Sequence, residues 1–398
     1  MTAARTALVI GGGIAGPVTA LALRRAGIEA TVFEAYADTA EGVGGILMVA
    51  PNGLAAFDVL GLADAVNAAG QLMPGMAIVD AGTGQDMMAF GGVPGLPPSR
   101  VVWRGDLHRL LHEAATAQGI RVEYGRRLVS VDESPYGVTA HFADGSSASA
   151  DLLIGADGIR STVRGLIDPA APGPRYVGLQ SFAGYGGPGA DSDGLMRFAQ
   201  GKRSFLGYWT QPDGQVGWFS NMPYEQPLTL AQARAVPAAT WLARLRDLHA
   251  DDLPARELLR HATEDSFFVF GPSEIMPSVP RWYRDRMVLV GDSAHAPSSS
   301  SGQGASLAVE SALHLARCLR DRPDLPSAFA AYERLRRPRV ARVAAFAERQ
   351  NNRKAAGPVG QVVFRAIAPL MMRTVLTPKR MFGWMHGYRI DWDAPVTG

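Results

Sequence analysis

The fold is decided by residues 6–17, which read TALVIGGGIAGP. The apolar run Thr6 to Ile10 predicts a buried parallel strand, and the glycines after it predict a tight turn. A helix is expected from about Ala15 to Ala26, because Gly27 would follow its C-terminal end. Glu29 to Glu34 predicts a second strand. The order strand, turn, helix, strand is typical of the βαβ unit of a doubly wound α/β sheet.

The turn contains the pattern G-x-G-x-x-G, in which each glycine has a physical reason. Gly11 would make the tight turn, Gly13 would let the backbone approach a pyrophosphate, and Gly16 would let the helix pack on the strand. Free N–H groups at the helix start, around Ala15, favour a phosphate. Glu34 ends the second strand near the spacing expected for a ribose-binding acid. The sequence therefore predicts a dinucleotide site. The alternative is a glycine-rich turn in a small α/β domain.

Two further segments follow the same logic of a strand that delivers polar residues to its carboxyl end. Residues 286–295 read RMVLVGDSAH, so a buried strand would end at Asp292. Gly302 to Gly304 then open another helix. Residues 152–161 read LLIGADGIRS and place Asp157 after a third buried strand. Alone, Asp292 could cap a helix, and Asp157-Gly158 could be an ordinary turn.

Together, the order and spacing of the three motifs resemble those of the class A flavin monooxygenases, the para-hydroxybenzoate hydroxylase-like family. The resemblance covers Ala7 to about Arg320. It implies a glutathione-reductase-like FAD-binding Rossmann domain, a strand-rich substrate domain and C-terminal helices. It also implies FAD as the cofactor, with NADPH or NADH as co-substrate.

The resemblance assigns roles to several residues. Asp292 would accept a hydrogen bond from the ribityl chain, and the helix after Gly304 would face the flavin pyrimidine ring and stabilise its anionic reduced form. Asp157 would contact both FAD and the nicotinamide, Arg104 would lie near the flavin phosphates, and the loop 42–53 would run beside the isoalloxazine. The predicted FAD-binding residues are Gly11, Gly13, Ala15, Gly16, Glu34, Gly45, Arg104, Asp157, Asp292, Gly302, Gly304 and Ala305.

The implied reaction is hydroxylation of an aromatic or polyketide-like small molecule through a flavin C4a-hydroperoxide. Because that species is an electrophile, the substrate would be electron-rich. The predicted substrate-pocket residues are Met48, Phe205, Trp218, Phe219 and Asn221. No pair of residues can be recognised in the sequence as a general acid and a general base. The weak catalytic candidates are Tyr185, Tyr208 and His295, each of which could equally belong to the core or only hold a loop.

Composition excludes several other classes. The formal charge is +2 and the basic residues form no block, so nucleic-acid binding is not expected. Cys318 is the only cysteine, which favours a reducing cytoplasm, and no metal site is expected. No segment is apolar enough for a membrane span, and the Arg-containing stretch Val359 to Leu376 is interpreted as an amphipathic helix. The expected partner is a small aromatic molecule, and the chain would be a monomer or a homodimer.

The expected domains are discontinuous. The FAD-binding domain would take residues 1–70, 99–173 and 282–325, and the substrate-binding domain would take 71–98 and 174–281. Residues 326–398 would form a C-terminal helical segment.

One departure from the family concerns the loop after the distal motif. Many relatives carry a Pro-Pro pair where this chain has Ser298 and Ser299. FAD binding should survive this change, whereas its effect on flavin mobility is open.

Three alternatives remain open at this level. One is a flavin enzyme that does not hydroxylate, such as an oxidase, a reductase or a Baeyer–Villiger enzyme; the Trp-x-Trp-x-Ile-Pro signature of a halogenase is absent. Another is a flavin-binding or ligand-binding relative without turnover. The third is a nicotinamide-dependent dehydrogenase without flavin.

Overall fold

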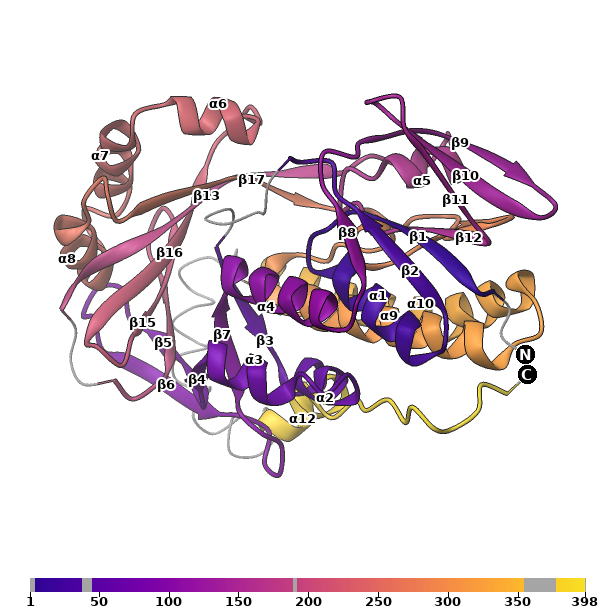
Figure 1. Cartoon of the computed structure of the whole chain (residues 1–398). Coiled ribbons are helices and arrows are strands. Elements are labelled where there is room, and N and C mark those ends of the chain that lie inside the picture. The colour runs from indigo at the N-terminus through magenta and orange to yellow at the C-terminus, as the bar shows by residue number, and fades with distance from the viewer. Residues whose placement is uncertain (1–3, 38–44, 189–191, 354–376, 398) are drawn as a thin grey trace.

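The structure is a computed structural model that describes residues 4–37, 45–188, 192–353 and 377–397. It confirms the predicted α/β class: one half is a parallel sheet with packed helices, and the other is a larger sheet covered by short helices (Figure 1). Residues 42–44 of the predicted flavin loop and the predicted helix Val359 to Leu376 lie outside the described residues.

A six-stranded sheet brings the three sequence motifs together, in the order β18-β19-β12-β1-β2-β8. The strands are β1 (Thr6–Ile10), β2 (Glu29–Phe33), β8 (Arg121–Glu123), β12 (Leu152–Gly155), β18 (Tyr283–Arg284) and β19 (Met287–Leu289). All neighbours pair in parallel except β18 and β19. Their carboxyl ends therefore meet at one edge, where open α/β sheets bind ligands.

Helices pack on this sheet because their apolar faces match its buried strands. They are α1 (Ala15–Arg25), α4 (Arg104–Ala117), α5 (Thr162–Ile167), α9 (Gly304–Asp321) and α10 (Leu325–Arg353). Helix α9 is the most central, since it is buried from Ser306 to Leu319, and it packs on both α1 and α10. Cys318 is buried within it. In the described part of the chain, none of the helices combines the length and the apolar character needed to cross a membrane.

Two small sheets flank this core. One is antiparallel and consists of β9 (Leu128–Ser134), β10 (Gly137–Phe142) and β11 (Ser147–Ala150), with a turn at 143–145. The other consists of β3 (Ile46–Val49), β4 (Gln71–Met73) and β7 (Ser99–Trp103), and α2 (Pro51–Val59) and α3 (Ala63–Ala69) lie beside it. Strand β7 leads directly into α4, so this sheet lies between the two halves of the molecule.

The second half is a seven-stranded sheet in the order β17-β13-β16-β15-β14-β5-β6. Its strands are β5 (Gly75–Val79), β6 (Asp86–Gly91), β13 (Arg175–Pro188), β14 (Met196–Gln200), β15 (Phe205–Thr210), β16 (Gln215–Pro223) and β17 (Phe267–Ile275). The helices α6 (Leu230–Ala235), α7 (Ala238–Leu248) and α8 (Leu253–His261) cover its outer face (Figure 1). The interpretation of this region as strand-rich overlooked these three helices.

The C-terminal segment returns to the first half. Helix α12 (Pro378–His386) contacts α2, and the residues after it run back along the core. The ring of Trp392 lies 5.2 Å from the guanidinium carbon of Arg25 on α1 and 4.9 Å from that of Arg320 on α9. These cation–π contacts fix the tail across the two helices.

Candidate active site

The three motifs touch one another through glycine contacts that leave no room for a side chain. A Cβ on Gly11, whose φ is +105°, would lie 2.5 Å from the carbonyl oxygen of Ala156, directly before Asp157. A Cβ on Gly291 would lie 2.9 Å from the Cβ of Ala15. The glycine turn therefore packs against both other motifs, as expected for residues at one edge of a sheet.

The first turn of α1 is built to receive an anion. The helix begins at Ala15 with no side-chain cap, so its first N–H groups have no intrahelical partner. Gly13 faces open space, since a Cβ there would have no protein atom within 4 Å. At Gly16 a Cβ would lie 1.8 Å from the carbonyl oxygen of Gly11. Gly16 is thus required by the packing of the protein, and Gly13 leaves space for a ligand.

Gly12, between these two, is held from both sides. Its amide donates to Oε2 of Glu34 over 2.6 Å, and its carbonyl oxygen lies 2.6 Å from Nε2 of His112. Because a carbonyl only accepts, His112 must donate from Nε2, and its Nδ1 accepts from the Tyr124 hydroxyl over 2.9 Å. The neighbouring His108 stacks on His112 with ring centroids 4.1 Å apart. Sequence reasoning found Glu34 but missed this histidine pair on α4.

Arg104 and Asp292 carry opposite charges at the same edge. The Asp292 side chain is accessible to water, yet burial raises the pKa of its carboxyl and the charge of Arg104 opposes that rise. A group that is both accessible and closely surrounded by protein lies in a recess. Arg104 is exposed, and its amide donates to the carbonyl oxygen of Gly45 over 2.9 Å. The predicted residues Gly45, Arg104 and Asp292 therefore lie within reach of one site.

The start of α9 forms another wall of this site. Gly304 is exposed at the first position of the helix, Ala305 is half-buried, and no side chain caps this end. Gly302 before it has a φ of +59°, and a Cβ there would lie 2.2 Å from Cε of Met48. Met48 lies on strand β3 and not in a loop as predicted, and β3 is thus in contact with the distal motif. Ser298, in place of the usual proline, caps the short 3-10 turn Ser299–Ser301.

The carboxylate of Asp157 makes its hydrogen bonds within the chain. Its carboxylate accepts hydrogen bonds from the Ser161 and Ser293 hydroxyls and from the amides of Thr162 and Val163. The carboxylate thus ties the start of α5 to Ser293, the neighbour of Asp292, because its oxygens are occupied within the chain. Burial raises the pKa of this carboxyl, and the hydrogen bonds oppose the rise.

The residues predicted for the substrate pocket divide between the two faces of the seven-stranded sheet. Side chains alternate along a strand, so Phe219 and Asn221 on β16 share the inner face with Phe205 on β15, their neighbour across the strands. Phe205 lies 5.7 Å from Phe219, and Phe219 and Met48 belong to one apolar cluster. Four of the five predicted residues, Met48 on β3 included, therefore lie on one side of the seven-stranded sheet.

Trp218 is the exception. It is fully buried on the outer face, against Phe182 and Phe267 and within the cluster that α7 and α8 complete. Tyr208 packs against the same cluster, and burial raises the pKa of its phenol to about 12. The expectation that these two residues face the ligand is corrected by the strand alternation, because helices that the sequence analysis overlooked cover their face.

Of the remaining catalytic candidates, Tyr185 lies on the inner face. Its ring is 5.8 Å from Trp103, the residue before Arg104, and 6.2 Å from Phe268. Burial raises the pKa of its phenol. His295 is buried, and its Nε2 lies 2.9 Å from the Ser311 hydroxyl. Burial, and then the charge of Arg336, lower the pKa of His295 to about 3, so the ring is neutral. This geometry favours the loop-holding role for His295.

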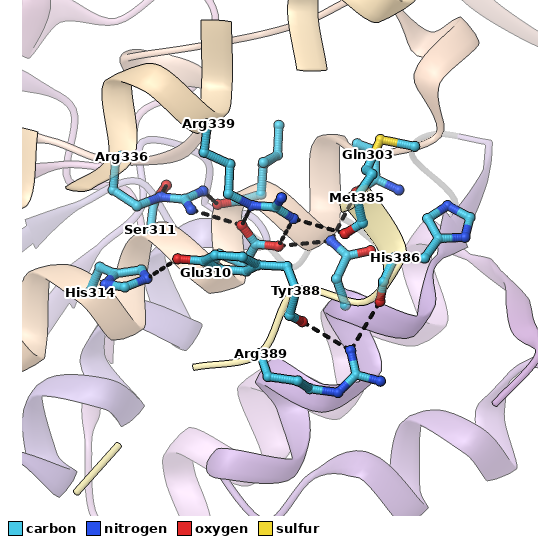
Figure 2. Close-up of polar contacts among 12 residues, drawn as sticks. Gln303, Glu310, Ser311, His314, Arg336, Arg339, Met385, His386, Tyr388 and Arg389 are labelled. Carbon is cyan, nitrogen blue, oxygen red and sulfur yellow. Dashed lines mark hydrogen bonds and ion pairs between the residues drawn. The ribbon is translucent and has the colours of Figure 1, made fainter. Parts of the chain in front are cut away.

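Sequence reasoning missed a buried polar network behind the start of α9. Glu310 binds the guanidinium groups of Arg336 and Arg339 (Figure 2). Asn52 connects it to Gln303. The available signal was a single glutamate inside the mainly apolar first half of α9.

A cavity of about 250 Å³ lies along the edge strand β17, and one of its lining residues, Phe270, packs against Gly45 of the predicted FAD site. It is lined by Arg234, Val236, Ala238 and residues 267–270. Among the residues that the structure describes, no group of three His, Cys, Asp or Glu side chains could hold a metal ion.

These residues fit FAD. An uncapped helix start, an open glycine and the exposed Arg104 suit a pyrophosphate, while the acidic Glu34 suits a ribose. Asp292 in its recess and the uncapped start of α9 suit the ribityl chain and the electron-rich end of a flavin.

Comparisons with known proteins agree with this geometry. A family model described as an FAD binding domain matches residues 4–347. The chain is 32% identical to aurachin C monooxygenase/isomerase from Stigmatella aurantiaca, over 83% of this chain and 85% of that protein. It is 31% identical to 3-amino-4-hydroxybenzoate 2-monooxygenase from Streptomyces cremeus, over 84% of each.

Among solved structures, HpxO from Klebsiella pneumoniae in complex with FAD and uric acid superimposes with a TM-score of 0.82 at 26% identity. The superposition covers 96% of each chain. Both the motifs and the whole fold are thus shared with FAD enzymes. The chain belongs to the FAD binding domain family of class A flavoprotein monooxygenases, and it is an FAD-dependent aromatic monooxygenase.

Proposed function

We propose that this enzyme uses NADPH or NADH and O₂ to hydroxylate a planar, electron-rich aromatic molecule on the inner face of its seven-stranded sheet. The relatives support the class of substrate. One is named 3-amino-4-hydroxybenzoate 2-monooxygenase, and the structure of another contains uric acid. Membership of an FAD binding family argues against a dehydrogenase without flavin. The relatives are monooxygenases, which favours the same reaction class here.

The observation that carries the proposal is that Phe205, Phe219 and Asn221 share one face of the sheet, and that Phe219 on this face packs in one apolar cluster with Met48. The two phenylalanines offer an aromatic surface. Asn221 adds polar character, since its Oδ1 accepts from the Ser181 hydroxyl over 2.8 Å, and that hydroxyl lies 2.6 Å from the Ser273 hydroxyl. Such a wall suits a flat ring that carries a polar substituent.

The chain's own contribution is to hold the cofactor and to keep the site dry. Bound FAD supplies the reduction of O₂ and the transfer of one oxygen atom. The start of α1, Glu34 and Arg104 would hold its adenosine and pyrophosphate part, and Asp292 and the start of α9 would hold its flavin part. Buried apolar residues next to the pocket, including Met73, Val101 and Trp209, would exclude water.

Tyr185 is the inner-face tyrosine that could assist the substrate. As a neutral phenol beside Trp103, it can donate a hydrogen bond to a substrate oxygen. We assign the substrate-binding part to residues 71–98 and 174–281 and the FAD-binding part to the flanking segments, in keeping with the two main sheets.

The test is turnover of the FAD-loaded enzyme under ¹⁸O₂, with NADPH or NADH and a panel of hydroxy- and aminobenzoates, hydroxyquinolines and urate. The expected result is that one compound accelerates nicotinamide oxidation and gains one ¹⁸O atom by mass spectrometry. Compounds that accelerate nicotinamide oxidation but leave every equivalent of O₂ as hydrogen peroxide, without labelled product, would show an oxidase and overturn the proposal.

A further inference from the structure

The buried network around Glu310 has an unusual charge balance. Glu310 is completely buried on α9, and its Oε2 lies 2.8 Å from Nη1 of Arg336 and 2.7 Å from Nε of Arg339. Its Oε1 accepts from Nη2 of Arg339 over 2.7 Å (Figure 2). Arg336 and Arg339 are three residues apart on α10, so they share the helix face that meets α9. One carboxylate thus faces two guanidinium groups.

The carboxylate is ionised in this setting. Burial would raise the pKa of Glu310, but the charges of Arg336 and Arg339 outweigh burial and lower it to about 2. Arginine keeps its proton at all relevant pH values. The three side chains together therefore carry a net charge of one positive unit.

The histidines around the network are neutral and add no charge to it. Burial, with the arginine charges, lowers the pKa of His295 to about 3, that of His386 to about 4 and that of His314 well below its usual value. His314 bonds to the Tyr388 hydroxyl over 2.7 Å, and the Tyr388 ring lies under the guanidinium of Arg339 (Figure 2). None of these groups cancels the surplus charge.

The network is connected to the start of α9. The side-chain amide of Asn52 donates to Oε1 of Glu310 over 2.8 Å and to Oε1 of Gln303 over 2.9 Å. Gln303 directly precedes the exposed Gly304. Glu310 is six residues further along the helix, which corresponds to about 9 Å at 1.5 Å per residue. The surplus charge thus lies behind the helix end that faces the flavin in the proposed arrangement.

Burying a surplus charge is costly, which makes a purely structural role a poor account of it. A carboxylate with one arginine would hold α9 to α10 without net charge. Because the second guanidinium is largely buried, water and salt screen it weakly, and its field extends into the protein.

We propose that the Arg336–Glu310–Arg339 cluster is an electrostatic element that acts through the start of α9 to favour the anionic, reduced form of the bound FAD. The cluster adds to the helix dipole, which has the same sign at this end. The proposal rests on FAD binding but not on the identity of the aromatic substrate.

The experiment is an anaerobic reductive titration of the FAD-loaded enzyme against a reference dye, without substrate. Glu310→Gln raises the cluster charge to two positive units and should move the flavin midpoint potential to more positive values. Arg339→Gln lowers the cluster charge to zero and should move it to more negative values. Each shift should change the ratio of reduced to oxidised flavin at a fixed potential roughly tenfold. The double variant restores one positive unit and should return near the wild-type potential.

Arg337→Gln is the matched control. Arg337 is on the same helix, but it pairs with Glu333 and is one-third exposed. Its loss should therefore change the ratio of reduced to oxidised flavin at a fixed potential by no more than about twofold. Arg339→Lys keeps the charge and loses the planar guanidinium, so it should keep the potential even if Arg339→Gln loads FAD poorly.

The proposal is overturned if the two single variants shift the midpoint potential in the same direction. It is also overturned if folded, FAD-loaded Glu310→Gln leaves the midpoint potential unchanged while Arg339→Lys changes it. Because no substrate is present, failure here is separate from failure to find a hydroxylated product.

Discussion

His112 donates a hydrogen bond of 2.6 Å to the carbonyl oxygen of Gly12, and this contact connects α4 to the glycine-rich turn. On the other side of the same glycine, its amide donates to Glu34. The turn is therefore fixed at Gly12, which lies between Gly11 at the bend and Gly13, which faces open space.

Replacing His112 by Phe should weaken FAD binding. The change leaves the Gly12 carbonyl and the Tyr124 hydroxyl without this partner, at a cost of about 1–3 kcal/mol. His112→Gln can still donate to the carbonyl and should recover part of the loss. The measurement is the FAD dissociation constant by flavin fluorescence, beside the thermal midpoint of the apoprotein. Equal affinity for the wild type and the Phe variant would refute this role.

Gly16→Ala and Gly13→Ala should fail for different reasons. A Cβ on Gly16 meets the Gly11 carbonyl oxygen at 1.8 Å, so this variant should unfold at lower temperature and contain no flavin. A Cβ on Gly13 meets no protein atom, so that variant should keep the apoprotein stability and lose affinity for FAD. Thermal unfolding of both apoproteins and the visible flavin spectrum distinguish the two. If the Gly13 variant loads FAD normally, the pyrophosphate does not approach this position.

Arg104→Gln should weaken FAD binding roughly 10- to 100-fold, because it removes a charged donor from the pyrophosphate region. Arg109→Gln is the matched control on the same helix. Arg109 pairs with Asp106 and Glu113 on the exposed surface, where ion pairs contribute little. Isothermal titration of the apoproteins with FAD measures both. A comparable loss in the two variants would point to damage to α4 and not to a phosphate contact.

Phe219 and Trp218 are neighbours on β16 that face opposite sides of the sheet. Phe219→Ala should raise the KM for the aromatic substrate roughly tenfold and release more hydrogen peroxide, with modest loss of stability. Trp218→Ala should destabilise the protein by about 3–5 kcal/mol, since it empties a fully buried site beneath the helices. Steady-state kinetics and urea unfolding of both variants check this division. It would be contradicted by a large KM effect in a stably folded Trp218 variant.

Stability should fall as the pH is lowered from 6.5 towards 4. Burial lowers the pKa of His108 and His386 to about 4 and that of His295 to about 3 in the folded protein. The unfolded chain therefore binds more protons in this window, and the free energy of unfolding decreases by up to about 1.4 kcal/mol per pH unit for each histidine.

Urea unfolding at pH 7, 6 and 5 measures this slope. His295→Gln should reduce the slope by about one histidine's share. His141→Gln, which changes a histidine whose side chain is 40% exposed, is the matched control. A slope that is the same in the wild type and in the His295 variant would exclude a buried neutral His295.

The glycine motifs could be predicted from the sequence because their constraints are local. Gly11 is required by its φ of +105° and Gly16 by its contact with the Gly11 carbonyl oxygen, and the order of the motifs then indicated the family. The assignment of Phe219 and Trp218 was harder. Alternation shows that they face opposite sides of the sheet. Which side meets the ligand depends on α6–α8, and their helical pattern was not recognised because the segments around them are aromatic strands.

The polar contacts of the site were less predictable because they join distant residues. Glu310, Arg336 and Asn52 are brought together by the packing of three helices, and nothing in their local sequence announces the partner. A lone glutamate in the mainly apolar first half of α9 and two histidines four residues apart on α4 were the available signals. Asp157 shows the converse, since its family motif was found and its hydrogen-bond partners were not.

The pairing of β1 with β12 and the contact of Trp392 with α1 and α9 have a consequence for biosynthesis. The glycine-rich turn leaves the ribosome well before β12, which follows more than a hundred residues later, and before Trp392. The FAD site therefore becomes complete only after these distant segments have been made, and until then β1 lacks its β12 partner and exposes a strand edge that favours aggregation.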